Sequence, residues 1–284
     1  MSKSSARGFS VNLFLPGGDP EGLRVVEKTN WNGRGLVFPK AMFAEGRARK
    51  ELGNTGVYIL AGASETGALP TIYVGEGDPV GPRLDDHFKK KQFWQHVVVF
   101  TSKDAILNKA HVQRLEARLV EIARDAKRCK LDNGNTPRPP SLSESDEDMV
   151  EGFLDNILLC LPVLGYSAFR RISWEDSSSP VLTLHGKSIT ARARETATGF
   201  VVEAGSGCVG DGELAPKYAD YMRELRGELI EQGVLVREGI GYRLAQDYVF
   251  SSPSLAAGIL LGNSVNGLTA WKTASGKALK ETKQ

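Results

Sequence analysis

Residues 56–75 read GVYILAGASETGALPTIYVG and contain two β-rich runs, 56–60 and 71–75, on either side of a small, polar segment. Val, Ile, Tyr and Thr favour strands, whereas Gly and Pro between two such runs favour a turn. The stretch therefore predicts a β-hairpin whose loop, residues 61–70, is longer than the tightest turns. The tripeptide Gly56-Val57-Tyr58 lies in the first strand and Tyr73-Val74-Gly75 in the second.

The segment after this hairpin predicts a helix, a strand and a second helix. Gly81-Pro82 stops the strand, and Pro82 suits the first turn of a helix that begins near Arg83. Residues 97–101 form a continuous apolar strand. Residues 110–128 carry apolar side chains at steps of three and four, which predicts one buried helix face.

The regions on either side of this segment differ from it in residue composition and predicted elements. Residues 9–60 read as short strands and turns, and residues 133–140 are rich in Asn, Gly and Pro, as in a linker. An amphipathic helix is expected at 147–161, ended by Pro162 and Gly165.

After residue 166 the pattern predicts a second small domain. Its expected helices are 216–232 and 253–261, the latter capped by Ser252 and Gly262, and strand-like runs precede and separate them.

Composition narrows the class of protein. The 284 residues are 41% hydrophobic and 25% charged, which allows a sizeable core and argues against general disorder. The formal net charge is only +2, so a nucleic-acid interaction must depend on local charge. Cys129, Cys160 and Cys208 are far apart, which argues against a disulfide framework or a structural zinc site. With no signal-like N-terminus and no apolar run that spans a bilayer, we expect a cytoplasmic protein without a membrane partner.

A set of polar side chains accompanies the hairpin and the two helices after it. Arg83 and His87 are four residues apart and share a helix face, and Glu116 lies on the apolar side of the next helix. Phosphodiester hydrolysis needs a base for water, a cation beside the phosphate and a carboxylate for a divalent metal. Together with Tyr58 and Tyr73, these residues could supply all three.

The order GVY, then YVG, then RLxxH, then LE on a helix resembles the GIY-YIG nuclease superfamily. The resemblance covers about residues 54–135, and Val57 stands where isoleucine is usual. It implies a small mixed or antiparallel sheet flanked by helices, with DNA as the substrate and Mg²⁺ or Mn²⁺ as the cofactor. A lone carboxylate among neutral ligands also suits Mg²⁺ chemically.

The resemblance implies a role for each candidate residue. Tyr58 and Tyr73 would touch the attacking water, with Tyr58 as the general base, and Arg83 would stabilise the phosphate. His87 would help the base or the phosphate, and Glu116 would be the single metal ligand. An asparagine should follow the second helix; both Asn133 and Asn135 fit, and Asn135 is preferred.

Each of these residues also has an ordinary structural interpretation. A tyrosine in a strand commonly packs with its hydroxyl at the surface. Glu116 could lie at the edge of the core, and Arg83 could form a surface ion pair with Asp86. The combination in this order, rather than any single residue, favours the nuclease interpretation.

Local charge supports a nucleic-acid partner. Residues 83–130 contain 12 Lys and Arg against 6 Asp and Glu, and Lys89, Lys90 and Lys91 lie directly before Phe93 and Trp94. We expect the three lysines to neutralise phosphates and Trp94 to stack on an exposed base. The alternative is a solvated lysine turn with Phe93 and Trp94 in the core. Residues 141–156 carry six acidic and no basic side chains and should face away from DNA.

The C-terminal part has its own resemblance. The run from GFVV at 199–202 through DYVFSSPS at 247–254 to Asn266-Gly267 and Trp271 is similar to the DUF4357 family, over about residues 188–280. That family has no settled activity and often occurs at the C-terminus of bacterial GIY-YIG proteins. The segment is either purely structural or a DNA-contacting accessory domain, and no catalytic set is visible in it.

The predicted fold class is α/β in the α+β sense: a GIY-YIG-like sheet flanked by helices, then a second small α+β domain. The predicted boundaries are a β-rich N-terminal extension packing on the nuclease domain at 1–53, a nuclease domain at 54–140, a linker and bridging helix at 141–166, and an accessory domain at 167–284.

The predicted function is metal-dependent DNA endonuclease activity. The alternatives are a non-catalytic DNA-binding protein on a nuclease fold, or a nuclease for RNA or structured nucleic acid. The oligomeric state is left open, a dimer included.

Overall fold

The computed structural model describes residues 8–63, 69–134, 137–170, 179–186, 188–196 and 199–282. These residues fall into two compact units. Unit 1 holds described residues 8–63 and 70–170, and unit 2 holds Leu69 with the described residues from 179 onward. The expected mixed α+β class, with a second small sheet domain, is confirmed. No helix among these residues is long and apolar enough to cross a membrane.

Unit 1 is built on one sheet, which has seven strands in the described residues, in the order β1-β2-β3-β6-β4-β5-β7. The strands are β1 (Val11–Phe14), β2 (Arg24–Lys28), β3 (Gly33–Pro39), β4 (Gly56–Gly62), β5 (Thr71–Gly77), β6 (His96–Ser102) and β7 (Lys130–Leu131). All neighbours pair antiparallel except β5 and β7, which are parallel. The predicted hairpin is β4-β5. The segment expected to be a β-rich extension packing on the nuclease domain supplies β1, β2 and β3 to the same sheet.

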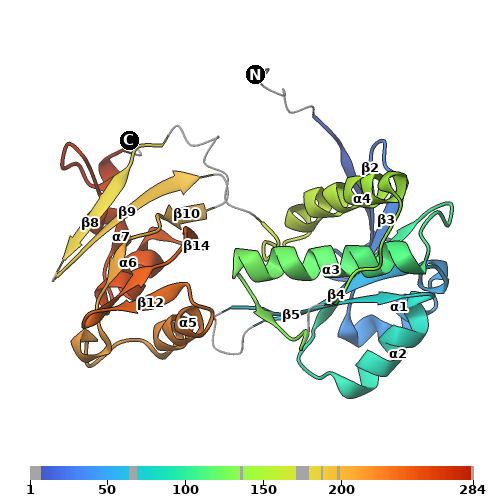
Figure 1. Cartoon of the computed structure of the whole chain (residues 1–284), viewed down its shortest axis with the longest axis horizontal. Coiled ribbons are helices and arrows are strands. Elements are labelled where there is room, and N and C mark those ends of the chain that lie inside the picture. The colour runs from blue at the N-terminus through green and yellow to red at the C-terminus, as the bar shows by residue number, and fades with distance from the viewer. Residues whose placement is uncertain are drawn as a thin grey trace. The chain divides into compact units, whose positions relative to one another are not determined.

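Both faces of this sheet are buried, because successive side chains of a strand point to opposite sides. On β4, Val57 and Ile59 belong to one core, which also contains α3 (Lys109–Ala126) and α4 (Glu144–Val163). Tyr58 and Leu60 belong to the other, on the side of α1 (Phe43–Arg47) and α2 (Val80–Lys90). Figure 1 shows α3 and α4 on the face of the sheet opposite to α1 and α2.

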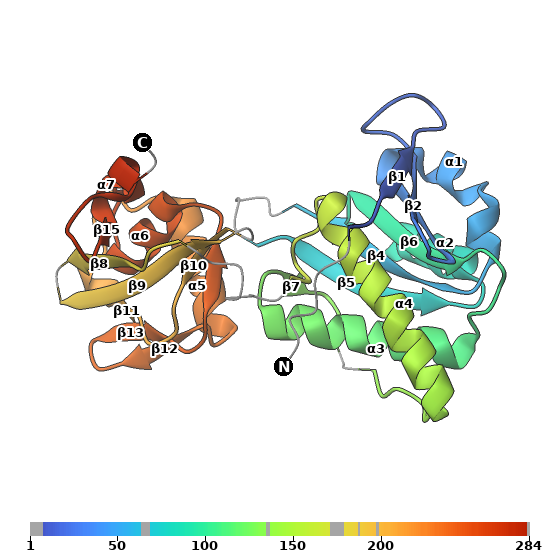
Figure 2. The ribbon, with the colours of Figure 1, turned by 90° about the horizontal axis from the view of Figure 1, so that it is seen from above.

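Helix α4 differs from its prediction in extent and in place. It begins at Glu144 because Ser143 caps it, its Oγ accepting a hydrogen bond of 3.2 Å from the Asp146 amide, and three acidic residues follow in the first turn. Pro162 lies inside the last turn rather than ending the helix. The helix packs on α3 within unit 1 (Figure 2), and its apolar face is part of that core rather than a bridge.

Unit 2 contains two sheets, in the described residues a five-stranded one of order β14-β10-β9-β8-β15 and a three-stranded one of order β11-β13-β12. Their strands are β8 (Leu182–Gly186), β9 (Ile189–Thr196), β10 (Gly199–Val202), β11 (Gly207–Cys208), β12 (Leu235–Glu238), β13 (Gly241–Leu244), β14 (Tyr248–Phe250) and β15 (Lys272–Thr273). The helices are α5 (Asp220–Glu231), α6 (Pro253–Leu261) and α7 (Gly267–Ala270).

The predicted caps of α6 are confirmed. The Ser252 hydroxyl accepts a hydrogen bond of 3.1 Å from the Leu255 amide, and Gly262 ends the helix with a φ of 67°. Trp271 is fully buried and donates from Nε1 to the Pro253 carbonyl at 3.0 Å. Gly267 allows this close approach, because a Cβ at that position would collide with the Pro253 backbone.

Candidate active site

The two motif tyrosines lie on one face of the β4-β5 hairpin. Tyr58 is paired with Gly75 and Tyr73 with Leu60, so the two rings are diagonal neighbours with centroids 6.3 Å apart. A Cβ at Gly75 would collide with the ring and hydroxyl of Tyr58. The glycine of the second tripeptide therefore makes room for the tyrosine of the first.

Helix α2 brings His87 against both tyrosines. Val80 and Leu84 are buried and fix the helix on the sheet. His87 Nε2 lies 2.8 Å from the Tyr58 hydroxyl, and its ring meets that of Tyr73 edge-on at a centroid distance of 4.8 Å. The three rings form one contiguous cluster that joins β4, β5 and α2.

Burial shifts the pKa values of this cluster in a consistent direction. It raises the pKa of the Tyr58 hydroxyl far above its ordinary value of 10.0, with the neighbouring Tyr73 adding to the effect. It lowers the pKa of His87 to about 4, helped by the positive charges of Lys91 and Arg83. At neutral pH His87 is therefore a neutral imidazole, so its Nε2 can accept a hydrogen bond from the Tyr58 hydroxyl.

Arg83 lies one helical turn before His87, and its side chain is exposed. Desolvation lowers its pKa, but the nearby Tyr58, Tyr73 and Glu76 outweigh that effect and raise it. Among the described residues no carboxylate lies within ion-pair distance of this guanidinium, so the surface pair with Asp86 is not formed. Its guanidinium acts on Tyr58 through a side-chain hydrogen bond and is not neutralised by any carboxylate that the structure describes, so it can contact an anion at the edge of the tyrosine cluster.

Glu116 projects from α3, which packs against β5. It is half-buried, and burial raises the pKa of its carboxyl group to about 7. The next largest cause is the negative charge of Glu76, whereas Arg83 and Lys109 act in the opposite direction. Glu116 is thus a carboxyl group at the edge of the core whose charge the surrounding protein does not fully neutralise.

Two further contacts in this region were not predicted. Glu76 directly follows the second tripeptide, and Lys109 holds both of its carboxylate oxygens at 2.7 Å. Lys91 pairs with Asp132, and its amine lies 4.2 Å from the centre of the Tyr73 ring. The position of Glu76 next to the motif was its only sequence signal, and the lysine run indicated Lys91 as a phosphate contact rather than as a partner of Asp132.

The structure gives Asn133 a defined place. Its side-chain carbonyl accepts a hydrogen bond from the Val74 amide at 2.9 Å, and its side-chain amide donates to the Val74 carbonyl at 2.8 Å. The Asn133 side chain therefore continues the backbone pairing of β5 after β7 has ended. This pairing fixes β5 at Val74, next to Tyr73. Asn135, the preferred candidate, lies outside the described residues, and its role stays a prediction.

The predicted nucleic-acid-binding residues divide into three kinds. Lys89 and Lys90 are exposed at the end of α2, as expected. Lys91 instead turns back onto Tyr73. Trp94 is only 1% exposed and packs near Phe43 and Phe88, with ring centroids 6.3 Å from each. The prediction that Trp94 stacks on a base is wrong, because the aromatic side chain fills the core under α2.

The side chains near Glu116 limit which divalent metal ion this region could hold. Among the described residues no group of three His, Cys, Asp or Glu side chains could together hold a metal ion. Zinc sites need three or four such ligands, whereas Mg²⁺ keeps several waters and uses one or two carboxylates plus phosphate oxygens. A single half-buried carboxyl group with Glu76 nearby therefore fits Mg²⁺ or Mn²⁺.

Comparisons with known proteins identify only the C-terminal part. Residues 182–283 match the family model of a domain of unknown function, DUF4357, which confirms that resemblance and extends it by a few residues at each end. No family model of GIY-YIG nucleases matches the N-terminal part. No curated protein and no solved structure matches the chain.

Proposed function

We propose that unit 1 is a metal-dependent endonuclease of the GIY-YIG kind that hydrolyses phosphodiester bonds in DNA. The observation that supports it most is the contact of 2.8 Å between His87 and the Tyr58 hydroxyl, with Tyr73 packed against His87. Arg83 and Glu116 are near enough to act electrostatically on both tyrosines. These groups come from β4, β5, α2 and α3. Each has an altered pKa, as catalytic groups commonly do.

The tyrosine–histidine pair provides a route for the proton of the attacking water. Because the pKa of His87 is about 4, its Nε2 is unprotonated at neutral pH and can accept the hydrogen bond of the Tyr58 hydroxyl. In the proposed step DNA binding admits a water to the buried Tyr58 oxygen, which takes a proton from that water as the hydroxyl proton passes to His87; His87 then returns that proton to solvent. The resulting hydroxide attacks phosphorus, the bond to the leaving oxygen breaks, and that oxygen takes a proton from solvent.

Arg83 and Glu116 would stabilise the negative charge on the phosphate. The guanidinium of Arg83, which no carboxylate neutralises among the described residues, can donate hydrogen bonds to phosphate oxygens as negative charge builds up. Glu116 would hold Mg²⁺ or Mn²⁺, which supplies Lewis-acid stabilisation of the same charge. Tyr73 packs against His87 and keeps its ring edge turned toward Tyr58.

The DUF4357 domain would assist recognition of the DNA. Support comes from the polar face of its larger sheet, where His185, Thr190 and Arg192 are exposed while the alternating residues of β8 and β9 are buried. Lys89 and Lys90, at the end of α2, would add phosphate contacts beside the active site.

A cleavage panel tests the function. Supercoiled, single-stranded and branched DNA and a structured RNA are incubated with the full chain and Mg²⁺ or Mn²⁺. We expect metal-dependent cleavage of DNA, reduced by about 10²- to 10³-fold in Glu116→Gln. The matched control is Glu121→Gln, which changes an exposed acid of the same helix paired with Arg118.

Each other result has a defined meaning. DNA binding without cleavage under any metal would favour a non-catalytic binding protein. Cleavage of RNA alone would change the substrate class, and equal activity of Glu116→Gln and Glu121→Gln would contradict the assignment of Glu116.

A further inference from the structure

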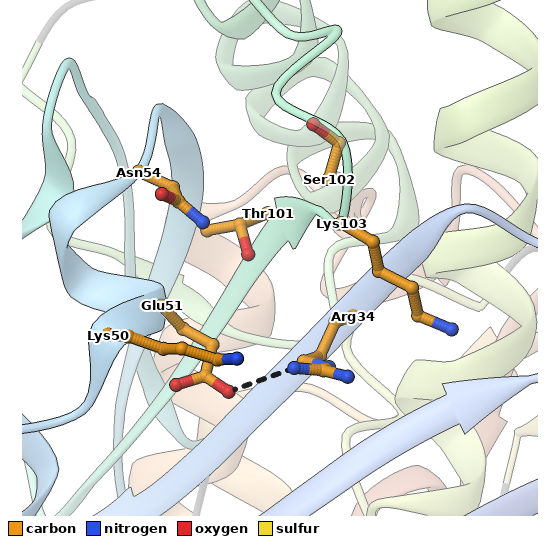
Figure 3. A pocket seen from close by; sticks show the side chains of 7 residues that line it. All are labelled: Arg34, Lys50, Glu51, Asn54, Thr101, Ser102 and Lys103. Atoms are coloured by element: carbon orange, nitrogen blue, oxygen red, sulfur yellow. Dashed lines mark hydrogen bonds and ion pairs between the residues drawn. The ribbon is translucent and has the colours of Figure 1, made fainter.

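A second polar site lies in unit 1, in a pocket of about 250 Å³ (Figure 3). Its walls come from the start of β3, the short helix at Lys50–Gly53 and the end of β6, and all its lining residues are polar. Arg34, Lys50 and Lys103 contribute three positive charges, and Glu51 contributes the one negative charge among the lining residues. None of these residues belongs to the tyrosine cluster.

The carboxylate in the pocket is already neutralised. Glu51 is 2% exposed, and its Oε1 accepts hydrogen bonds from Arg34 Nη1 at 3.3 Å and Arg49 Nη2 at 3.0 Å. Its Oε2 accepts a third, from Arg49 Nε at 3.2 Å. Outside the pocket, Glu27 pairs with Arg34 at 2.8 Å and with Lys103 at 3.2 Å. These contacts hold the two side chains in place.

Three other hydrogen-bond donors in the pocket form no contact of this kind. In the part of the chain that the structure describes, the amine of Lys50, the side-chain amide of Asn54 and the hydroxyl of Thr101 make no hydrogen bond or ion pair. Figure 3 shows the Lys50 amine turned toward the Arg34 guanidinium, beside Glu51. Two cations that face the same space repel one another, and an anion between them removes that cost.

The pocket lies on the same side of the sheet as the tyrosine cluster. Thr101 follows Val99 by two residues, and Val99 is the sheet partner of Tyr58, so both side chains point to the face of α2. Two residues of a strand correspond to about 7 Å along the sheet. This displacement is short enough for one DNA strand to reach both the tyrosine cluster and the pocket.

We propose that this pocket binds a backbone phosphate of the nucleic acid near the phosphate that is cleaved. The inference rests on the proposed nuclease function. A whole small molecule is commonly enclosed in about 300–1,000 Å³, so a pocket of this size suits one group of a longer chain. Lys50 supplies the free charge, Arg34 a fixed cationic wall, and Thr101 and Asn54 neutral donors for the phosphate oxygens.

The test is DNA binding by the full chain, measured as fluorescence anisotropy of a labelled duplex in EDTA over a range of salt concentrations. Because one phosphate contact is lost, Lys50→Ala should reduce the log–log salt slope by about 0.9, and Lys50→Arg should restore it. Thr101→Val removes a neutral donor, so the slope should stay while the Kd rises about three- to tenfold. Arg138→Ala, an exposed cation of unit 1 outside the pocket, is the matched control.

The outcomes separate the two proposals. If the wild-type chain binds DNA and Lys50→Ala has the same slope as Arg138→Ala, the pocket assignment is wrong and the nuclease proposal stands. A wild-type chain that binds no duplex contradicts both. If inorganic phosphate binds the wild-type chain tightly while DNA binding is unaffected by Lys50→Ala, the pocket serves a free anion, and the backbone assignment is again wrong.

Discussion

In unit 2, the guanidinium of Arg226 is 2% exposed and lies among acceptors: the Val209 and Ile259 carbonyls, the Cys208 sulfur and a carboxylate oxygen of Asp211. In unit 1, by contrast, Glu116 has a raised pKa, and Arg83 has no carboxylate within ion-pair distance among the described residues. A buried charge with a full set of partners stabilises a fold. A buried charge without such partners lowers the stability of the fold. Proteins retain such a charge where a bound ligand supplies the missing partner. The proposed chemistry of unit 1 accounts for the unneutralised carboxyl group of Glu116, whereas the fully partnered Arg226 belongs to the core of unit 2.

The largest predicted effect concerns the structural charge. Arg226→Met leaves two carbonyls of unit 2 without their donor, so we expect unit 2 to lose about 3–5 kcal/mol of unfolding free energy. Calorimetry measures this loss. Arg223→Met, an exposed change on the same helix, is the control and should cost less than about 0.5 kcal/mol. Equal unfolding free energies of the two variants would show that the contacts of Arg226 do not stabilise unit 2.

The next effect is a pH dependence that arises from His87. Its pKa falls from 6.5 to about 4 on folding, so between these values the unfolded chain binds more protons. Unfolding free energy should therefore be at its full value above pH 6.5 and decrease as the pH falls toward 4. Since solvent screens the half-buried ring, we expect a loss on the order of 1 kcal/mol.

Denaturant titrations at several pH values measure this slope in the wild type and in His87→Gln. The variant should show a flatter profile over that interval. An unchanged profile would mean that His87 is not held neutral by its surroundings.

The smallest effect concerns the lysines at the end of α2. Lys89→Ala combined with Lys90→Ala should reduce the salt slope of DNA binding by about 1.8 and leave cleavage at saturating DNA unchanged. Lys91 is excluded from this pair, because it contacts Asp132 and Tyr73. Its replacement should lower the cleavage rate itself. A lower rate for the Lys89, Lys90 variant at saturating DNA would place these lysines in the active site.

Sequence reasoning succeeded where the argument depended on local periodicity. The alternation in 56–60 and 71–75 and the helical spacing of Arg83 and His87 follow from the repeat of each element, and the structure brings these residues together. The caps of α6 are also local, since Ser252 and Gly262 act on backbone groups of their own helix.

It failed where contacts join distant elements. Lys109 reaches Glu76 across 33 positions and Lys91 reaches Asp132 across 41, and no local pattern indicates either pair. Trp94 follows a lysine run, so charge alone suggested exposure, but Phe43 and Phe88 from other elements surround it. The three N-terminal strands were separated from the nuclease sheet because the pairing of β3 with β6 is invisible before the fold is known.

The central claim is that the Tyr58–His87 contact performs chemistry rather than packing. Tyr58→Phe tests it most directly, because the change removes one oxygen from a fully buried ring and keeps the shape of the core. The measurement is the single-turnover cleavage rate on DNA with Mg²⁺, together with the unfolding free energy. We predict a rate lower by about 10²- to 10⁴-fold with stability within about 1 kcal/mol of the wild type. A variant that cleaves at the wild-type rate would contradict the account.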